Sequence, residues 1–356
     1  MRRSELCKRL RDSCWRYEIL QEDDGGIVVA LERGGRIIGV YPDPDGDNLL
    51  WVSPSLGAAE SELSPSWNVG GERTWLSPEL EFNLRDLNKP DSYIVQPDID
   101  PGRYRQSVPE SGRRSVRWTN EGAANAYRSG DRRDFRLTKR CRLVSDPLAA
   151  AGLSSDIPGY SFVGYEMETS IRHLSRSAGG VVSLWTIVQV PDGGVALAPT
   201  YGAVRPKDFF ADTGEHRLSV EPGGVRFRIV ADEAHKISLK FAQTTGRFGY
   251  CRRGSDGLSR LLIRQIAVRP SFAYLDAPLR EPEDTGHCVQ LYSDDGALGA
   301  FGELEHHSHA YGSASDGEQA PDVCQMWGYS GPEAAMERIA ARLLGMSIEQ
   351  LPGEEA

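Results

Sequence analysis

The chain has 356 residues, of which 39% are hydrophobic, and its formal net charge is −10 at pH 7. This composition is ordinary for a globular protein, and the negative charge argues against a nucleic-acid backbone as a general partner. We find no apolar run long enough to span a bilayer and no secretory signal after the basic N-terminal residues. The six cysteines include no C-x-x-C pair, which argues against a structural zinc knuckle. From the missing signal and membrane span we expect a soluble, reduced, cytoplasmic protein with no membrane partner.

Two helices are predicted, one near each end of the chain. The stretch SELCKRLRDSCW (residues 4–15) has a candidate N-cap in Ser4 and apolar residues at helical spacing. In GPEAAMERIAARLLG (residues 331–345), Pro332 suits the first helical turn and Gly345 suits the C-terminal cap. The clear helical signals are confined to these two stretches.

Between these helices, apolar and polar residues alternate in many short segments, as they do in strands with one buried face. Gly34 and Gly35 separate two such segments and signal a β-hairpin. The other segments cover residues 48–53, 114–121, 134–145, 160–175, 181–190, 216–230, 235–243, 247–253, 261–268, 288–293, 300–309 and 323–329. Because no helical pattern is interspersed, we predict an all-β fold, a large antiparallel β-sandwich or barrel.

These patterns divide the chain into three parts. Residues 1–24 form an N-terminal helix and lead-in, residues 25–330 one β domain, and residues 331–356 a C-terminal helix and tail. Within the β domain, residues 54–113 are rich in Pro, Ser and Gly and alternate less regularly. A long excursion of this kind over a sheet often carries function.

The segment FGELEHHSH (residues 301–309) concentrates acidic and histidine side chains on one face of a strand. Because side chains alternate, Glu303, Glu305, His307 and His309 point to the same side. Two carboxylates side by side cost free energy unless a ligand or a cation compensates them. Glu305 and the two histidines could instead hold one metal ion, but the sequence has no obvious second cluster of metal ligands. We therefore expect no metal site and no cofactor here.

Two further predicted strands present polar faces. In residues 181–190, Trp185 and Gln189 share the polar face, and in residues 162–172 Glu166 lies opposite the apolar residues. Such faces are often simply the solvated side of a sandwich. A tryptophan among polar neighbours is more typical of a ligand platform than of open surface. These side chains are therefore candidate ligand contacts, with partly buried packing as the alternative for the tryptophan.

Five stretches follow one another in an order that resembles a known superfamily. They are NLLWVS (48–53), GGERTWLSPELEF (70–82), LWTIVQV (184–190), HKISLKFAQTTGRFGY (235–250) and FGELEHHS (301–308). The order resembles the galactose mutarotase-like (aldose 1-epimerase-like) superfamily, and its uncharacterised bacterial branches more closely than the epimerases proper. The resemblance covers roughly residues 25–312. It implies a β-supersandwich of two large antiparallel sheets, one of them concave, with a sugar site in the concavity.

The resemblance also implies roles for individual residues. Members of the superfamily open a sugar ring by general acid–base catalysis, in which a glutamate on a late strand takes the proton of the anomeric hydroxyl. By position this base is Glu303, with Glu305 as the next candidate. An early arginine that holds a sugar hydroxyl corresponds to Arg73, and Trp75 follows it on the same face of an extended segment.

The sequence departs from the epimerase pattern in its histidines. The epimerases carry two histidines in the first half and middle of the chain, whereas here no histidine precedes His173. Where the resemblance would place the second one, this sequence has Trp185 or Thr186. His307, on the same face as Glu303, is the candidate replacement for the missing proton donor.

Two classes of function remain open from the sequence. The first is an enzyme that acts on a sugar or sugar acid, as an epimerase, isomerase or lyase with a glutamate base. The second is a non-catalytic carbohydrate-binding or sensing module on the same fold. Lys236 is one of only six lysines and lies in one of the superfamily-like stretches, so it is a further candidate ligand contact, with an ordinary exposed lysine as the alternative. The sequence does not indicate an oligomeric state.

Overall fold

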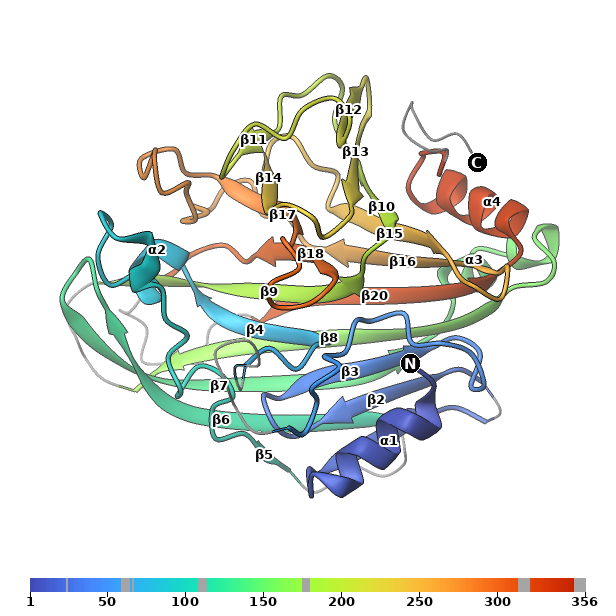
Figure 1. The fold of residues 1–356 in the computed structure, drawn as a ribbon, viewed down its shortest axis with the longest axis horizontal. Coiled ribbons are helices and arrows are strands. Elements are labelled where there is room, and N and C mark those ends of the chain that lie inside the picture. The colour runs from blue at the N-terminus through green and yellow to red at the C-terminus, as the bar shows by residue number, and fades with distance from the viewer. Residues whose placement is uncertain are drawn as a thin grey trace.

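The computed structural model shows two large antiparallel sheets packed face to face, with short helices at their margins (Figure 1). It describes residues 1–23, 25–58, 65, 67–107, 114–174, 180–312 and 321–348. The all-β class and the two-sheet β-supersandwich expected from the sequence are confirmed by this strand pairing.

The first sheet brings together strands from both ends and the middle of the chain. In spatial order it contains β1 (Tyr17–Gln21), β2 (Ile27–Leu31), β3 (Arg36–Tyr41), β4 (Glu72–Ser77), β9 (Val181–Pro191), β18 (Phe301–His307), β17 (His287–Ser293), β14 (His235–Lys240) and β11 (Lys207–Asp208), and β19 (Tyr311–Gly312) pairs with β9. Strands β4, β9 and β18 lie side by side in antiparallel register although they are far apart in the sequence.

The second sheet contains the longest strands of the protein. Its spatial order is β12 (Leu218–Glu221), β13 (Gly224–Ile229), β10 (Gly194–Pro199), β15 (Arg247–Arg253), β16 (Ser259–Ile266), β20 (Asp322–Gly331), β8 (Ser161–His173), β7 (Asp131–Val144), β6 (Ser115–Ala126) and β5 (Arg105–Gln106). Within the described residues, the helices are α1 (Arg3–Asp12), α2 (Glu79–Phe82), α3 (Pro147–Ala150) and α4 (Glu333–Leu343), and 3₁₀ turns lie at Pro90–Ser92 and Ser154–Asp156. Among the described helices, none combines the length and apolar character needed to cross a membrane.

The main hydrophobic core lies between the two sheets. Val188 and Leu304 of the first sheet belong to the same buried cluster as Tyr165 and Met326 of the second sheet. Since side chains alternate along β18, the residues next to Leu304 in the sequence point away from this core. The outer face of the first sheet is therefore free to carry polar side chains.

The two longer helices cover the outer faces of the sheets. Leu6 and Leu10 of α1 pack with apolar residues of β2 and β3, and Met336 and Ile339 of α4 pack against β16 and β20. Figure 1 shows these helices at opposite margins of the sandwich. Each helix is thus stabilised by one apolar stripe, as its sequence period predicts.

The N-terminal segment differs in two details from the prediction. Helix α1 begins at Arg3, with Arg2 in the N-cap position, so Ser4 lies inside the first turn and does not cap the helix. Residues 17–21, expected to be a lead-in, form β1 and pair with β2 at the edge of the first sheet. The sheet therefore begins before residue 25.

Residues 48–53 do not form the strand that their apolar pattern predicted. The Asn48 side chain accepts a hydrogen bond from Val40 N and donates one to Ile38 O, both at 2.9 Å. Beyond it, Val52 forms an isolated bridge with Gly70. The amide side chain thus takes the place of a backbone ladder beside β3, a side-chain contact that periodicity does not reveal.

Candidate functional site

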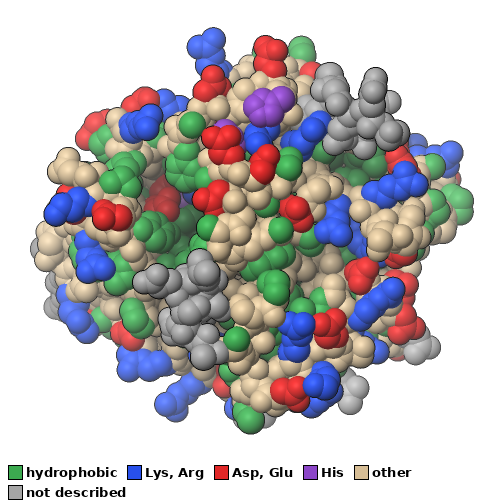
Figure 2. All heavy atoms as spheres, in the orientation of Figure 1, with side chains coloured by type: hydrophobic (Ala, Val, Ile, Leu, Met, Phe, Trp, Pro, Cys, Tyr) green, Lys and Arg blue, Asp and Glu red, His purple; other side chains and the backbone are tan. Residues whose placement is uncertain are grey.

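A cavity of about 600 Å³ lies on the outer face of the first sheet. Its floor consists of side chains from β4, β9, β14, β17 and β18, which point away from the core between the sheets. Figure 2 shows a hollow between α2 and the β17–β18 region, with acidic side chains at depth and hydrophobic side chains around them. We refer to this cavity as the cleft.

Strand register explains why the floor residues meet. Glu303 of β18 is paired with Gln189 of β9, and Trp75 of β4 is paired with Trp185 of β9. Glu305 follows Glu303 on the same face, two residues further along β18. The alternation read from the sequence therefore places these side chains together once the three strands are neighbours.

The Glu303 carboxylate is held by two donors on one side only. Its Oε1 atom accepts hydrogen bonds from Arg73 Nη2 at 2.8 Å and from Gln189 Nε2 at 3.1 Å. The Oε2 atom has no hydrogen-bond partner among the described residues, and the side chain lines the cleft. The arginine lies over the ring of Trp75, 4.6 Å from its centroid. One carboxylate oxygen is thus anchored and the other remains available to a ligand.

Glu305 and Lys236 form a second ion pair on the floor. Glu305 Oε2 lies 3.0 Å from Lys236 Nζ and accepts a hydrogen bond from Trp185 Nε1 at 2.7 Å. The ammonium also lies 4.7 Å from the centre of the Trp185 ring and 3.7 Å from Glu79 Oε2. Two buried ion pairs therefore stand next to each other, with Trp185 bonded to one of them.

The electrostatic surroundings of this second pair differ from those of an exposed pair. Burial raises the pKa of Glu305 to about 7, with Lys236 opposing the rise and the charge of Glu303 adding to it. Burial by itself would lower the pKa of Lys236, but the carboxylates of Glu305, Glu79 and Asp276 outweigh burial and raise this pKa. The lysine therefore stays cationic, while Glu305 can gain or lose a proton near neutral pH.

The structure places His307 behind Trp185 instead of in the cleft. The two rings stack with their centroids 5.6 Å apart, and the imidazole is almost fully buried. Nε2 lies 3.2 Å from Gln290 Oε1, and Nδ1 lies 2.9 Å from Ser77 Oγ. Since an amide oxygen only accepts, Nε2 carries the proton and Nδ1 accepts from the serine hydroxyl.

The expected role of His307 as a proton donor to the ligand is therefore not supported. Burial lowers the pKa of this imidazole to about 4, so it is neutral at physiological pH. It is also absent from the described residues that line the cleft. Its contacts support Trp185 from behind, which is a positioning role.

Glu166 is likewise not part of the cleft. It belongs to β8, in the second sheet, where it accepts hydrogen bonds from Arg142 Nε and Gln325 Nε2, each at 2.8 Å. Its place opposite the apolar face of the strand agrees with the sequence pattern. Periodicity does not say which of two sheets a strand joins, so the pattern of β8 did not place this side chain relative to the cleft.

The remaining predicted residues occupy the floor or its immediate support. Arg73, Trp75, Trp185 and Lys236 line the cleft, whereas Gln189 is fully buried and acts through its hydrogen bond to Glu303. The structure thus brings together most of the side chains selected from the sequence.

The walls of the cleft come from segments that sequence reasoning did not identify residue by residue. They contribute Trp67, Glu79, Leu80, Leu84, Pro90, Tyr93, Phe209, Phe210, Ala211, Ala277, Leu279, Arg280, Asp294 and Leu298. The earlier of these lie in the irregular segment 54–113, for which a function was expected. Asp276 ties two walls together because its Oδ1 accepts from Glu79 N at 3.0 Å and its Oδ2 from Gln290 Nε2 at 2.6 Å.

Three acidic residues of the cleft, Glu79, Glu303 and Glu305, are paired with cations. Within the described part of the chain, no group of three or more His, Cys, Asp or Glu side chains has an arrangement that could hold a metal ion. In particular, His309 contacts the rings of Phe272 and Tyr311 instead of joining Glu305.

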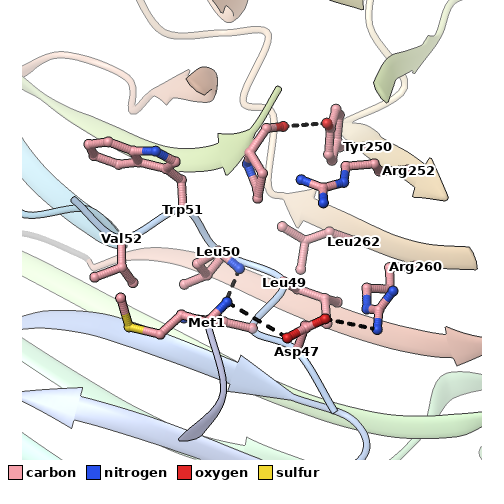
Figure 3. A pocket seen from close by; sticks show the side chains of 12 residues that line it. Met1, Asp47, Leu49, Leu50, Trp51, Val52, Tyr250, Arg252, Arg260 and Leu262 are labelled. Atoms are coloured by element: carbon pink, nitrogen blue, oxygen red, sulfur yellow. Dashed lines mark hydrogen bonds and ion pairs between the residues drawn. The ribbon is translucent and has the colours of Figure 1, made fainter. Parts of the chain in front are cut away.

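A second, smaller hollow of about 240 Å³ lies beside the N-terminus, next to residues 47–52 and strands β15 and β16 (Figure 3). Asp47 is the carboxylate among the described residues that line it. This side chain lies 3.8 Å from the amine of Met1 and 3.5 Å from Arg260 Nη2. A cation lies beside each oxygen of this carboxylate, whereas Glu303 in the larger cleft is bonded through one oxygen only, so the larger cleft is the better candidate.

Comparison with known proteins places the chain in a family. It belongs to a family of unknown function, DUF6786, whose model matches residues 11–353. No curated protein matches the chain. The solved structures that it resembles include galactose 1-epimerase from Lactobacillus acidophilus NCFM, with 12% identity, a TM-score of 0.43, and 88% of this chain and 92% of that chain covered.

A second similar structure is the GalM/aldose epimerase homologue from C. elegans, with 8% identity, a TM-score of 0.40, and 88% of this chain and 98% of that chain covered. Both proteins carry names of the superfamily that the sequence resembles. At such low identity and TM-score, the likeness carries no conclusion about substrate or activity.

Proposed function

We propose that the cleft binds a sugar or sugar acid and that the protein acts on it by acid–base chemistry through Glu303. The observation that carries the proposal is the Glu303 carboxylate, with Oε1 anchored by Arg73 and Gln189 and Oε2 left without a partner among the described residues at the cleft floor. A base must lie within hydrogen-bond reach of the proton that it removes, and an anchored carboxylate with a free oxygen meets this requirement.

The chemistry of the floor suits a hydroxyl-rich ring. Carboxylate oxygens accept hydrogen bonds from neighbouring hydroxyls, and the cations of Arg73 and Lys236 donate to ring and hydroxyl oxygens. Trp75 and Trp185 add aromatic surface that can pack against the apolar face of a sugar. Polar groups at the floor would thus orient the ligand, while the tryptophans would supply apolar contact.

A proton-transfer cycle can be written with residues of the floor alone. Glu303 takes the proton of a sugar hydroxyl, and the negative charge that develops on the oxygen is stabilised by the Lys236 ammonium in a site of low dielectric. Glu305, whose pKa burial raises to about 7, returns a proton to a second oxygen. For an aldose, these steps open the ring at the anomeric carbon, and their reversal closes it with either configuration.

A non-catalytic sugar-binding or sensing module is the second candidate. It is favoured by the two ion pairs, Arg73–Glu303 and Lys236–Glu305, because each carboxylate is already compensated before any ligand arrives. Groups that are fixed in this way also suit recognition without turnover. Binding and turnover must therefore be measured separately.

The test combines a binding screen with an assay for anomer exchange. Purified protein is screened by calorimetry against aldoses and uronic acids, and exchange between the anomers of each ligand is followed by NMR. In Glu303→Gln, we expect turnover to fall by about a hundredfold or more, the scale of general-base contributions, while affinity changes much less. If the wild type binds a sugar without any exchange, and Glu303→Gln weakens only affinity, the binding module is the correct interpretation.

Glu166→Gln is the matched control. This glutamate is also a buried strand residue bonded to an arginine, but it lies in the second sheet, outside the cleft. Its replacement should leave sugar affinity and anomer exchange unchanged. A wild-type protein that binds none of the sugars or uronic acids tested contradicts the proposed function in both its forms.

A further inference from the structure

The floor of the cleft carries two ion pairs, whereas apolar side chains predominate on its walls. The charged side chains of Arg73, Lys236, Glu303 and Glu305 come from strands at the bottom. The apolar wall residues come from the connecting segments above and are Leu80, Leu84, Pro90, Phe209, Phe210, Ala211, Ala277, Leu279 and Leu298. Figure 2 shows the same separation, with acidic side chains deep in the hollow and hydrophobic ones around it.

Two aromatic side chains at the cleft remain exposed to solvent. Tyr93 is 39% exposed and Phe210 is 46% exposed, although both line the cleft. They come from different segments of the chain, and Phe210 is held in place by an edge-to-face contact with Tyr292 at 6.2 Å between centroids. Clustered apolar surface of this kind, rimmed by polar groups, marks a binding site more often than inert surface.

The size of the cleft exceeds what one sugar ring at the floor would fill. Its volume of about 600 Å³ falls within the range of roughly 300–1,000 Å³ that is typical of sites for drug-sized ligands. A ring held by the two ion pairs would leave the space between the walls to water. An apolar group attached to the ring would displace that water and cover the exposed aromatic surface.

A second sugar ring is a poorer fit to the same space. Its hydroxyl groups would need hydrogen-bond partners, since unpaired polar groups in a desolvated site cost free energy. Of the polar wall residues, Glu79 is close to Lys236 and bonded to Tyr93, and Asp294 already accepts from Tyr292 and from the backbone of Gly296, which leaves Arg280 as the polar wall side chain open to a second ring. The walls therefore match an apolar substituent better than a second ring of hydroxyls.

We propose that the natural ligand is an amphipathic sugar, in which an aryl or alkyl group replaces the hydrogen of one sugar hydroxyl. The sugar lies on the floor, and the apolar group lies between the walls, in contact with Phe210, Leu84 and Tyr93. The sugar end of this proposal rests on the proposed function, whereas the apolar end rests on the walls. The apolar end can therefore fail while the sugar site stands.

The experiment compares matched ligands that differ only in their apolar group. Calorimetry is carried out with methyl and phenyl glycosides of glucose, galactose and mannose, and with the free sugars and their 6-O-benzoyl esters. In at least one pair, the substituted ligand should bind tenfold or more tightly, which corresponds to about 1.4 kcal/mol. Phe210→Ser should remove most of this preference and should lower the affinity for the substituted ligand far more than that for its unsubstituted partner.

Phe272→Ser is the matched control, because Phe272 is also an exposed phenylalanine, at 50%, but is not among the described residues that line the cleft. Phe272→Ser should leave the affinities for the substituted ligand and for its unsubstituted partner unchanged. Glu303→Gln should weaken the binding of the substituted and the unsubstituted ligand of a pair by the same factor. Tyr93→Ser serves as a second wall variant, and circular dichroism checks that each variant is folded.

The remaining outcomes separate the two proposals. If the sugars bind but no substituted ligand exceeds its partner, or if disaccharides bind more tightly than the aryl derivatives, the apolar site is refuted and the sugar site stands. The same conclusion follows if both wall variants keep the full preference for the apolar group. If no ligand of either series binds, the sugar site itself is refuted, and the amphipathic ligand with it.

Discussion

Replacing Glu305 by glutamine should change how the stability of the protein depends on pH. In the folded protein, burial raises the pKa of this carboxyl from 4.5 to about 7. Between these two values the folded protein keeps the proton and the unfolded chain has lost it. The free energy of unfolding therefore falls as pH rises through this window, because the folded state binds more protons.

The size of the effect follows from the shift in pKa. One pKa unit corresponds to about 1.4 kcal/mol, so the shift from 4.5 to about 7 amounts to about 3 kcal/mol for this fully buried group. The amide of the Glu305→Gln variant does not titrate, and the neighbouring ammonium of Lys236 stays charged throughout the window. The difference in unfolding free energy, wild type minus Glu305→Gln, should thus fall by about 3 kcal/mol from pH 4.5 to pH 7.

His307→Gln provides a control of opposite sign. Burial lowers the pKa of this imidazole from 6.5 to about 4. The stabilisation that the neutral imidazole contributes is therefore complete above pH 6.5 and is lost as pH falls towards 4. The difference between wild type and His307→Gln should therefore rise by about 3 kcal/mol from pH 4 to pH 6.5. In the wild type the contributions of Glu305 and His307 to the pH dependence of the unfolding free energy largely offset each other. The pH dependence of Glu305→Gln therefore shows the contribution of His307, and that of His307→Gln shows the contribution of Glu305.

Urea unfolding followed by tryptophan fluorescence, repeated between pH 4 and pH 8.5, measures these differences. Two results contradict the reasoning for Glu305. A difference that stays constant with pH means that this carboxyl titrates in the folded protein as it does in the unfolded chain. A difference that rises with pH means that the ion pair with Lys236 outweighs burial.

Two further predictions concern buried charges beneath the cleft. Asp100→Asn should destabilise the protein by about 3–5 kcal/mol in urea unfolding, because loss of the carboxylate leaves the buried Arg36 guanidinium uncompensated. Asp100 accepts hydrogen bonds from Arg36 Nη2 at 2.7 Å and from Trp75 Nε1 at 2.8 Å. A destabilisation below about 1 kcal/mol would show that the arginine finds another partner. Lys139→Met should instead stabilise the protein by up to about 3 kcal/mol at pH 7, because burial lowers the pKa of the lysine to about 8 and its Nζ has no hydrogen-bond partner among the described residues. This gain should disappear as pH rises from 8 to 10.5, since the lysine is then neutral in both states, and a pH-independent difference would contradict it.

The sequence predicted the floor of the cleft better than its walls. Glu303 and Glu305 on one face of β18, and Trp185 and Gln189 on one face of β9, follow from the two-residue period of a strand, which is a local property. Arg73 was selected through the order of the superfamily-like stretches, and the structure pairs it with Glu303. The residues of β9 and β18 were thus assigned to a strand face from local sequence alone, and the pairing of β4, β9 and β18 in the structure then brings these faces together.

The failures have a common cause in contacts between distant parts of the chain. Glu166 was assigned to the correct face of β8, but this strand belongs to the second sheet. His307 was assigned to the correct face of β18 but lies behind Trp185. Residues 48–53 kept their apolar character without forming a strand, because the Asn48 side chain occupies the edge of β3. In each case the pattern described one segment correctly and left its neighbours undefined.

The sequence by itself therefore determined the all-β class, the helices at both ends and the polar faces of individual strands, because these depend on side-chain periodicity within a few residues. Only the tertiary structure decided that β4, β9 and β18 adjoin, that wall segments as distant as Leu84 and Phe210 enclose one cleft, and that Glu305 is buried enough for its pKa to rise. These properties arise from packing between residues that are far apart in the chain. Desolvation in particular depends on everything that surrounds a group and not on its sequence neighbours.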